Sequence, residues 1–180
     1  MLHYKSIADM WYYDMLCVSI TYWHFLYTNI ESYKGVIMKK IIFIGKSSCG
    51  KTSLCQVLQG EEVKHKETQS IDFYDDFIDT PGEYLENRVY YSALITTAAE
   101  ANIIALVQEC GDTISMMPPG FAGTFGREVI GVITKIDKKE CEDSISIIEE
   151  QLMAAGVSKI FKVSVYSGDG IDEFKKYYVK

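Results

Sequence analysis

The chain has 180 residues, 48% of them hydrophobic, and a formal net charge of −7. This length is typical of one domain with a sizeable core, and the negative charge disfavours a broad basic face for nucleic acid. The five cysteines form no C-x-x-C pair and the three histidines lack ligand spacing, so no zinc cluster is expected. We expect free thiols and a reducing, cytoplasmic setting.

Residues 1–37 differ in composition from the rest of the chain and hold nine aromatic residues. Their apolar run, residues 15–27, is too short to span a bilayer and lacks the features of a signal peptide, so no transmembrane segment is expected. Three interpretations stand. Translation begins at Met38 and the extension is an upstream artefact, or the extension is an amphipathic helix for a partner or membrane surface, or it is a helix that covers the domain itself.

A phosphate-binding loop is predicted directly after the first strand. The apolar run Ile41–Ile44 is strand-like, the next eight residues match G-x-x-x-x-G-K-[ST], and the helix-compatible stretch Ser53–Gln59 follows. Gly45 and Gly50 let the loop curl until successive N–H groups point at a phosphate. The positive end of the following helix favours the same anion.

Two side chains of this loop have specific expected roles. Lys51 is expected to reach the β- and γ-phosphates, and the Thr52 hydroxyl to ligate Mg²⁺. The alternative is a Gly-rich turn that binds nothing, which the flanking strand and helix disfavour. We interpret Cys49 as a small residue that fills the loop, and a redox switch is the less favoured alternative. The nucleotide contacts predicted here are Gly45, Lys46, Ser47, Ser48, Cys49, Gly50, Lys51 and Thr52.

A second phosphate-sensing element is predicted after an edge strand, Thr68–Phe73, and a short strand ending at Ile78. Asp79 and Gly82 form a D-x-x-G motif. The carboxylate is expected to hold Mg²⁺ through a water, and the glycine N–H to sense the γ-phosphate. An ordinary turn is the alternative interpretation.

Glu83 follows at the position where switch GTPases often carry a glutamine that orients the attacking water. A carboxylate cannot donate to that water and repels the γ-phosphate, so slow unaided hydrolysis is expected. The alternative is that Glu83 only opens a helix, where a negative side chain is favourable.

The middle of the chain alternates between expected helix and strand. Asn87–Glu100 is predicted to be a helix, and the continuous apolar runs Ile103–Val107 and Val129–Ile133 to be buried parallel strands. Between these two strands, residues 109–127 form the longest irregular stretch of the domain. It is either a cover over a ligand or partner site or a packed connection.

A base-reading motif, T-K-x-D, follows the second of these strands. The Asp137 carboxylate can accept from N1–H and N2–H₂ of guanine, and adenine offers neither donor. The Lys135 stem is expected to lie along the base. Thr134 replaces the more usual asparagine, and its shorter reach predicts a weaker brace for the loop.

The last elements complete an α/β fold. Asp143–Ala155 is predicted to be a helix, Lys159–Val163 a strand, and Ile171–Tyr178 the terminal helix. Ser164 and Val165 stand where a second base-contacting loop belongs, with a backbone N–H facing guanine O6. Alternating strands and helices predict a central, mostly parallel sheet with helices on both faces.

The order of these motifs over residues 38–180 resembles that of a small GTPase, and more narrowly that of the EutP/PduV family of ethanolamine- and propanediol-utilisation proteins. The resemblance implies a three-layer, Ras-like P-loop NTPase in the bacterial cytoplasm, tied to a metabolic microcompartment. It also implies that Thr68 is the switch threonine that closes on Mg²⁺, and residues 1–37 have no counterpart in the family pattern. The stretches that carry it are Gly45–Thr52, Lys66–Gln69, Asp79–Tyr84, Ala105–Gln108, Pro118–Phe121 and Gly131–Asp137.

Three functions are compatible with these residues. The leading hypothesis is a slow GTP-hydrolysing switch or assembly factor, with shell or enzyme proteins of a microcompartment as partners. The second is an ATP-dependent phosphotransferase that acts on a small carboxylate such as acetate, although only Arg88 and Arg127 are available as lid arginines. The third is a binding module that nucleotide only stabilises. The expected catalytic residues are Lys51, Thr68, Gly82 and Glu83, and the expected metal ligands are Thr52, Thr68 and Asp79.

Overall fold

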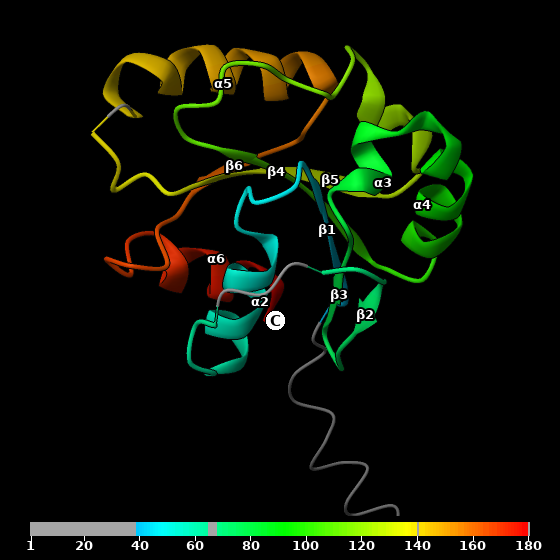
Figure 1. The fold of residues 1–180 in the computed structure, drawn as a ribbon, viewed down its shortest axis with the longest axis horizontal. Coiled ribbons are helices and arrows are strands. Elements are labelled where there is room, and N and C mark those ends of the chain that lie inside the picture. Colours follow the sequence, from blue (N-terminus) through cyan, green and yellow to red (C-terminus); the bar gives the residue numbers. More distant parts are fainter. Residues whose placement is uncertain (1–38, 65–67, 140, 180) are drawn as a thin grey trace, which may run out of the picture. The chain divides into compact units, whose positions relative to one another are not determined.

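A computed structural model describes residues 39–64, 68–139 and 141–179 of the chain (Figure 1). The chain divides into two units, residues 1–37 and 38–180, and the described residues all belong to the second. The three interpretations of the N-terminal extension therefore concern residues outside the described part.

The described residues form one six-stranded sheet in the order β2-β3-β1-β4-β5-β6. Every neighbouring pair is parallel except β2 and β3, which are antiparallel, so the predicted mostly parallel sheet is confirmed. The strands are β1 (Ile41–Gly45), β2 (Asp72–Phe73), β3 (Phe77–Asp79), β4 (Ile103–Glu109), β5 (Glu128–Thr134) and β6 (Ile160–Lys162).

Helices cover both faces of the sheet, which confirms the three-layer α/β fold (Figure 1). One face packs against α2 (Lys51–Gln59) and α6 (Ile171–Tyr178). The other face packs against α3 (Glu83–Glu86), α4 (Tyr91–Ala98), α5 (Cys141–Ala155) and the 3₁₀ turn η2 (Phe121–Thr124).

Within the described ranges, no helix is long and apolar enough to cross a membrane.

Strand β1 shows why the sequence builds this arrangement. Its side chains alternate, with Ile42 and Ile44 in the core under α4 and α5 and with Ile41 and Phe43 in the core under α2 and α6. All four are fully buried. A strand that is covered on both faces must be apolar at every position, which is the pattern the sequence carries.

A predicted helix and a predicted edge strand differ from the structure. The single helix expected over Asn87–Glu100 is wrong, because Asn87 has an extended backbone (φ −117°) and its side chain accepts the Val89 N–H at 3.1 Å. That contact starts the 3₁₀ turn η1 (Arg88–Tyr90), and α4 begins only afterwards. The edge strand expected over Thr68–Phe73 is reduced to the two residues of β2.

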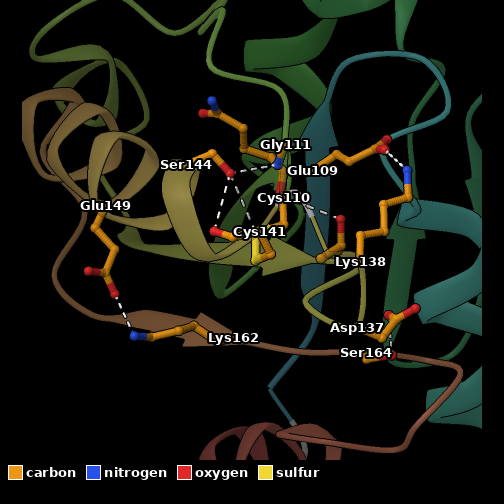
Figure 2. Close-up of a disulfide and its surroundings, with 12 residues drawn as sticks. Glu109, Cys110, Gly111, Asp137, Lys138, Cys141, Ser144, Glu149, Lys162 and Ser164 are labelled. Carbon is orange, nitrogen blue, oxygen red and sulfur yellow. Dashed lines mark hydrogen bonds and ion pairs between the residues drawn. A yellow bond between two sulfur atoms is a disulfide. The ribbon is translucent and has the colours of Figure 1, made fainter.

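The expectation of free thiols is wrong for two cysteines. Cys110 and Cys141 form a disulfide with a Cα–Cα distance of 5.1 Å, although they lie 31 residues apart in sequence (Figure 2). The reason is topological, because the exit of β4 and the start of α5 meet at one edge of the sheet. Cys49 and Cys55 are free and buried, and Cys17 lies outside the described residues. The disulfide removes the cysteine argument for a reducing setting.

We expect reduction of this disulfide to lower the free energy of unfolding by about 2–4 kcal/mol, because the cross-link closes a long loop in the unfolded chain. Urea unfolding of the full chain with and without dithiothreitol measures the loss. The double variant Cys110→Ala, Cys141→Ala is the control and should unfold identically in both buffers. Alkylation of both cysteines in the unreduced, denatured protein would contradict the cross-link.

Candidate functional site

A cavity of about 390 Å³ opens where β1, β3, β5 and β6 end and α2 begins. Ligands of open α/β sheets bind at this edge. Its lining is Ser47, Ser48, Gly50, Lys51, Thr52, Ser53, Val63, Thr68, Thr80, Gly82, Thr134, Lys135, Val165 and Tyr166. The other residues predicted for the site are Gly45, Lys46, Cys49, Asp79, Glu83, Asp137 and Ser164, which lie outside this lining.

The loop between β1 and α2 curls around the Lys51 side chain. Its Nζ donates to the carbonyl oxygens of Gly45 at 2.9 Å and Lys46 at 2.7 Å, and the residue is only 5% exposed. Gly50 has φ +97°, in the left-handed region that favours glycine. At Gly45 a Cβ atom would lie 2.3 Å from the Val107 carbonyl oxygen, so a side chain cannot be accommodated there.

Cys49 fills the underside of this loop. It is 3% exposed. Burial raises the pKa of its thiol, and the nearby Lys51 ammonium offsets only part of that effect. The group therefore stays a neutral thiol at neutral pH, which agrees with its interpretation as a small loop filler.

The three predicted metal ligands lie in one cluster. The hydroxyls of Thr52 and Thr68 donate to the same Asp79 oxygen, Oδ2, at 2.6 and 2.7 Å, and the two hydroxyl oxygens are 2.8 Å apart. The other carboxylate oxygen of Asp79 is buried and has no hydrogen-bond partner in the described part of the chain. Hydroxyl and carboxylate oxygens suit a hard cation such as Mg²⁺, and an unpartnered buried carboxylate oxygen is compatible with one.

The segment after Asp79 lies directly on the phosphate loop. A Cβ atom on Gly82 would lie 2.0 Å from the Ser47 backbone nitrogen, although Gly82 has an ordinary φ of −62°. Four residues later, Glu86 Oε1 accepts the Ser47 N–H at 2.7 Å. Glu83 begins α3 and is exposed, so its position is compatible with the helix-opening interpretation.

The base-reading motif is joined to the same loop. The Thr134 hydroxyl donates to the Cys49 carbonyl oxygen at 2.5 Å, and Lys135 Nζ donates to the Ser48 carbonyl oxygen at 2.8 Å. The short Thr134 side chain thus reaches the loop, and the weaker brace expected from it stays a prediction. The loop approaches the end of β5 closely enough for a short hydroxyl to span the gap.

Asp137 is held by the second predicted base loop. Its Oδ1 accepts from the Ser164 hydroxyl at 2.5 Å, while Val165 and Tyr166 line the cavity beside it. Tyr166 is 74% exposed, which leaves its ring open at the mouth of the cavity. The T-K-x-D motif and the Ser164 loop, 27 residues apart, thus converge on one side of the cavity.

Two acidic residues of the stretch that was expected to be irregular form ion pairs with lysines of the site. Glu109 Oε2 accepts from Lys135 Nζ at 2.6 Å, and Asp112 Oδ2 accepts from Lys46 Nζ at 2.5 Å. The strand was expected to end at Val107, but β4 continues to Glu109. The sequence did carry a signal for this contact. Glu109 lies two residues after the apolar run Ile103–Val107, and the next strand leads to Lys135.

Comparison with known sequences identifies close relatives. The sequence model of a family described as "Ethanolamine utilisation - propanediol utilisation" (PduV-EutP) matches residues 38–180. The propanediol utilization protein PduV of Citrobacter freundii is 48% identical over 136 residues, which are 76% of this chain and 90% of that protein. The Escherichia coli (strain K12) protein named "Probable acetate kinase EutP" is 30% identical over 143 residues, 78% of this chain and 89% of that one.

Solved structures with a similar fold are more distant in sequence. The bacterial selenocysteine-specific elongation factor EF-Sec has a TM-score of 0.59 and 22% identity, over 77% of this chain and 28% of that one. The GDP-bound RocCORdC part of Methanosarcina barkeri Roco2 has a TM-score of 0.55 and 21% identity, over 77% of this chain and 47% of that one. The chain spans less than half of either structure, and the likeness concerns the fold alone.

Gly82→Ala should lower the free energy of unfolding by about 1–3 kcal/mol, because the added methyl group meets the Ser47 backbone and forces the two segments apart. Gly123→Ala is the matched control, since a Cβ there meets nothing within 4 Å, and its effect should stay within about 0.5 kcal/mol. Urea unfolding of both variants measures the difference. Equal stability of the two would contradict the close contact.

Proposed function

The chain belongs to the ethanolamine utilisation–propanediol utilisation family (PduV-EutP), and from this premise we propose that it is a Mg²⁺-dependent GTP-binding protein that hydrolyses GTP slowly. The observation that carries the proposal is the link between base-reading and phosphate-binding elements. Lys135 bonds to the carbonyl of Ser48, and Asp137 is oriented by the Ser164 hydroxyl. The base-reading motif is thus joined to the phosphate-binding loop, so a guanine contact would lie beside a phosphate contact.

The phosphate side of the proposal rests on the loop from Gly45 to Thr52. Its curled backbone and the start of α2 supply N–H donors, and Lys51 is the buried cation that would meet the β- and γ-phosphates. The acidic chain can still bind an anion, because these donors act locally and do not depend on net charge.

Thr52, Thr68 and Asp79 are the residues that would hold Mg²⁺ in this proposal. When bound, the ion would neutralise charge on the phosphate oxygens. Thr68 comes from the segment that precedes the edge strand, so its hydroxyl can report nucleotide state to that edge. Gly82 is proposed to contact the γ-phosphate through its N–H, next to Ser47.

Base choice is assigned to Asp137 and Lys135. The carboxylate would accept two hydrogen bonds from guanine, and its Ser164 partner fixes the direction of the free lone pairs. The Ser164–Val165 backbone would face guanine O6. An adenine in this position leaves the carboxylate without donors, which disfavours ATP.

Slow hydrolysis is proposed because the side chains expected nearest the attacking water, Glu83 and Glu86, are carboxylates. Glu83 begins α3, and Glu86 already bonds to the loop at Ser47. Neither carboxylate can donate to an attacking water, and both oppose the negative charge of the transferred group.

The biological setting of the proposal follows the relatives. The Citrobacter freundii protein is named for propanediol utilization, so we place this chain in the same kind of catabolism. From the family resemblance we further propose a cytoplasmic location associated with a bacterial microcompartment. Shell or enzyme proteins of that compartment are the proposed partners, with no nucleic acid among them.

A second candidate function is phosphoryl transfer to a small carboxylate. The Escherichia coli and Salmonella typhimurium relatives are named "Probable acetate kinase EutP", the latter 38% identical over 108 residues. In this reaction a carboxylate oxygen of acetate would attack the γ-phosphorus, forming acetyl phosphate and releasing the nucleoside diphosphate. A third possibility is a module that binds nucleotide without turnover.

GTP with Mg²⁺ should bind the full chain more tightly than ATP, and Asp137→Ala should abolish the preference. Asp137→Asn should instead favour xanthosine triphosphate, because an amide donates to the 2-oxo group that xanthine carries in place of the guanine amine. Isothermal titration with the three nucleotides measures both effects. Tighter ATP binding that is indifferent to Asp137 would overturn the guanine assignment.

Glu83→Gln should raise the rate of GTP hydrolysis about tenfold, because an amide can donate to and orient the attacking water. Phosphate release at saturating GTP measures the rate. The second candidate is tested in the same assay by adding acetate and trapping acetyl phosphate with hydroxylamine. Acyl phosphate formed at a rate above that of phosphate release would replace the hydrolysis proposal with phosphotransfer.

A further inference from the structure

We propose that Glu109 is a positioning residue for guanine recognition, which it supports by clamping the two lysines on either side of Asp137. The inference rests on the proposed function, and it adds a residue outside the phosphate and base motifs. It assigns base selectivity to a carboxylate that does not line the cavity and would not touch the nucleotide.

The contacts of Glu109 span the base-reading loop. Its Oε2 accepts from Lys135 Nζ at 2.6 Å, and its Oε1 accepts from Lys138 Nζ. Figure 2 shows Glu109 and Lys138 directed toward each other, on the same side of the sheet edge as Asp137 and Ser164. Both carboxylate oxygens are therefore committed to the loop that presents Asp137.

Glu109 is itself held in a fixed position. It is the last residue of β4, in register with Thr134 of β5, and the next N–H, that of Cys110, donates to the Thr134 carbonyl at 2.9 Å. The Cys110–Cys141 disulfide then ties this point to the first turn of α5. A strand pair and a covalent cross-link thus leave the Glu109 backbone little freedom to move.

Lys135 needs such an anchor. Its φ of +58° lies in the left-handed region, which costs a residue with a side chain free energy and persists only when surrounding contacts impose it. The side chain is held at two points, by the Ser48 carbonyl and by Glu109. Without the Glu109 carboxylate, the Lys135 side chain would keep only its bond to the Ser48 carbonyl oxygen. The negative charge that Lys135 and Lys138 share would also be lost.

The charge state of Glu109 suits this role. Burial acts to raise the pKa of its carboxyl group, but hydrogen bonds from Lys135 and Lys138 outweigh burial and hold the pKa below its ordinary value. The group is therefore ionised at neutral pH, and both of its oxygens accept from ammonium donors.

The test compares nucleotide discrimination in the full chain and in Glu109→Gln. The amide nitrogen cannot accept from an ammonium, so one of the two lysines loses its bond to residue 109 while side-chain size is kept. We expect GTP affinity to fall about tenfold and the ratio of GTP to ITP affinity to shrink, since ITP lacks the amine that Asp137 would bind. Affinity for magnesium tripolyphosphate, which has no base, should stay unchanged.

Glu149→Gln is the matched control. Glu149 of α5 forms an ion pair with Lys162 of β6 at 2.7 Å (Figure 2). Neither residue lines the cavity. Loss of this ion pair should leave the GTP to ITP ratio unchanged. Glu109→Asp, a second variant that keeps the charge, should recover part of the ratio.

The outcomes separate this inference from the proposed function. An unchanged GTP to ITP ratio in Glu109→Gln, with the wild type preferring GTP, overturns the positioning role alone. A loss of tripolyphosphate affinity equal to the loss of GTP affinity also overturns it, because the residue would then only support the fold. Absence of a GTP preference in the wild type overturns the proposed function.

Discussion

Four consecutive residues of the phosphate loop are hydrogen-bonded to side chains from other segments, and the geometry of the whole cavity depends on these bonds. The partners come from the segment after β4, from α3 and from the end of β5, and on the loop they meet three backbone groups and one lysine side chain. The pairs are Lys46 with Asp112, Ser47 with Glu86, Ser48 with Lys135 and Cys49 with Thr134.

This arrangement explains how an acidic chain can offer a site for an anion. Two of the nearby carboxylates, Glu109 and Asp112, face lysines, and hydrogen bonds from those lysines outweigh burial and hold both pKa values below their ordinary range. The negative charges of Glu109 and Asp112 are thus paired with lysines of the protein. The Lys51 side chain donates to loop carbonyl oxygens, which carry no net charge. Its positive charge is therefore not neutralised by these contacts and can act on an anion in the cavity.

The two proposed activities, GTP hydrolysis and phosphoryl transfer to a small carboxylate, differ in the fate of the γ-phosphate. Metal binding near Asp79 would serve both activities, whereas base selection by Asp137 would favour GTP over the ATP that the phosphotransferase hypothesis invokes. In both proposals the acceptor, water or a small carboxylate, would approach near Glu83 and Glu86. A carboxylate acceptor would itself be repelled by these two side chains, so a kinase would need a cation to offset that repulsion.

The sequence alone determined the order of strands and helices and the identity of the motifs at their ends. Apolar runs such as Ile103–Val107 are local signals for buried strands. The spacing of the two motifs predicts glycine at positions 45 and 82, where the backbone closely approaches another segment. What only the tertiary structure decided are contacts between segments far apart in sequence. The Cys110–Cys141 bridge, the Glu109 clamp on Lys135 and the reach of Thr134 to Cys49 depend on how parallel strands end at one edge, and no local pattern encodes those distances.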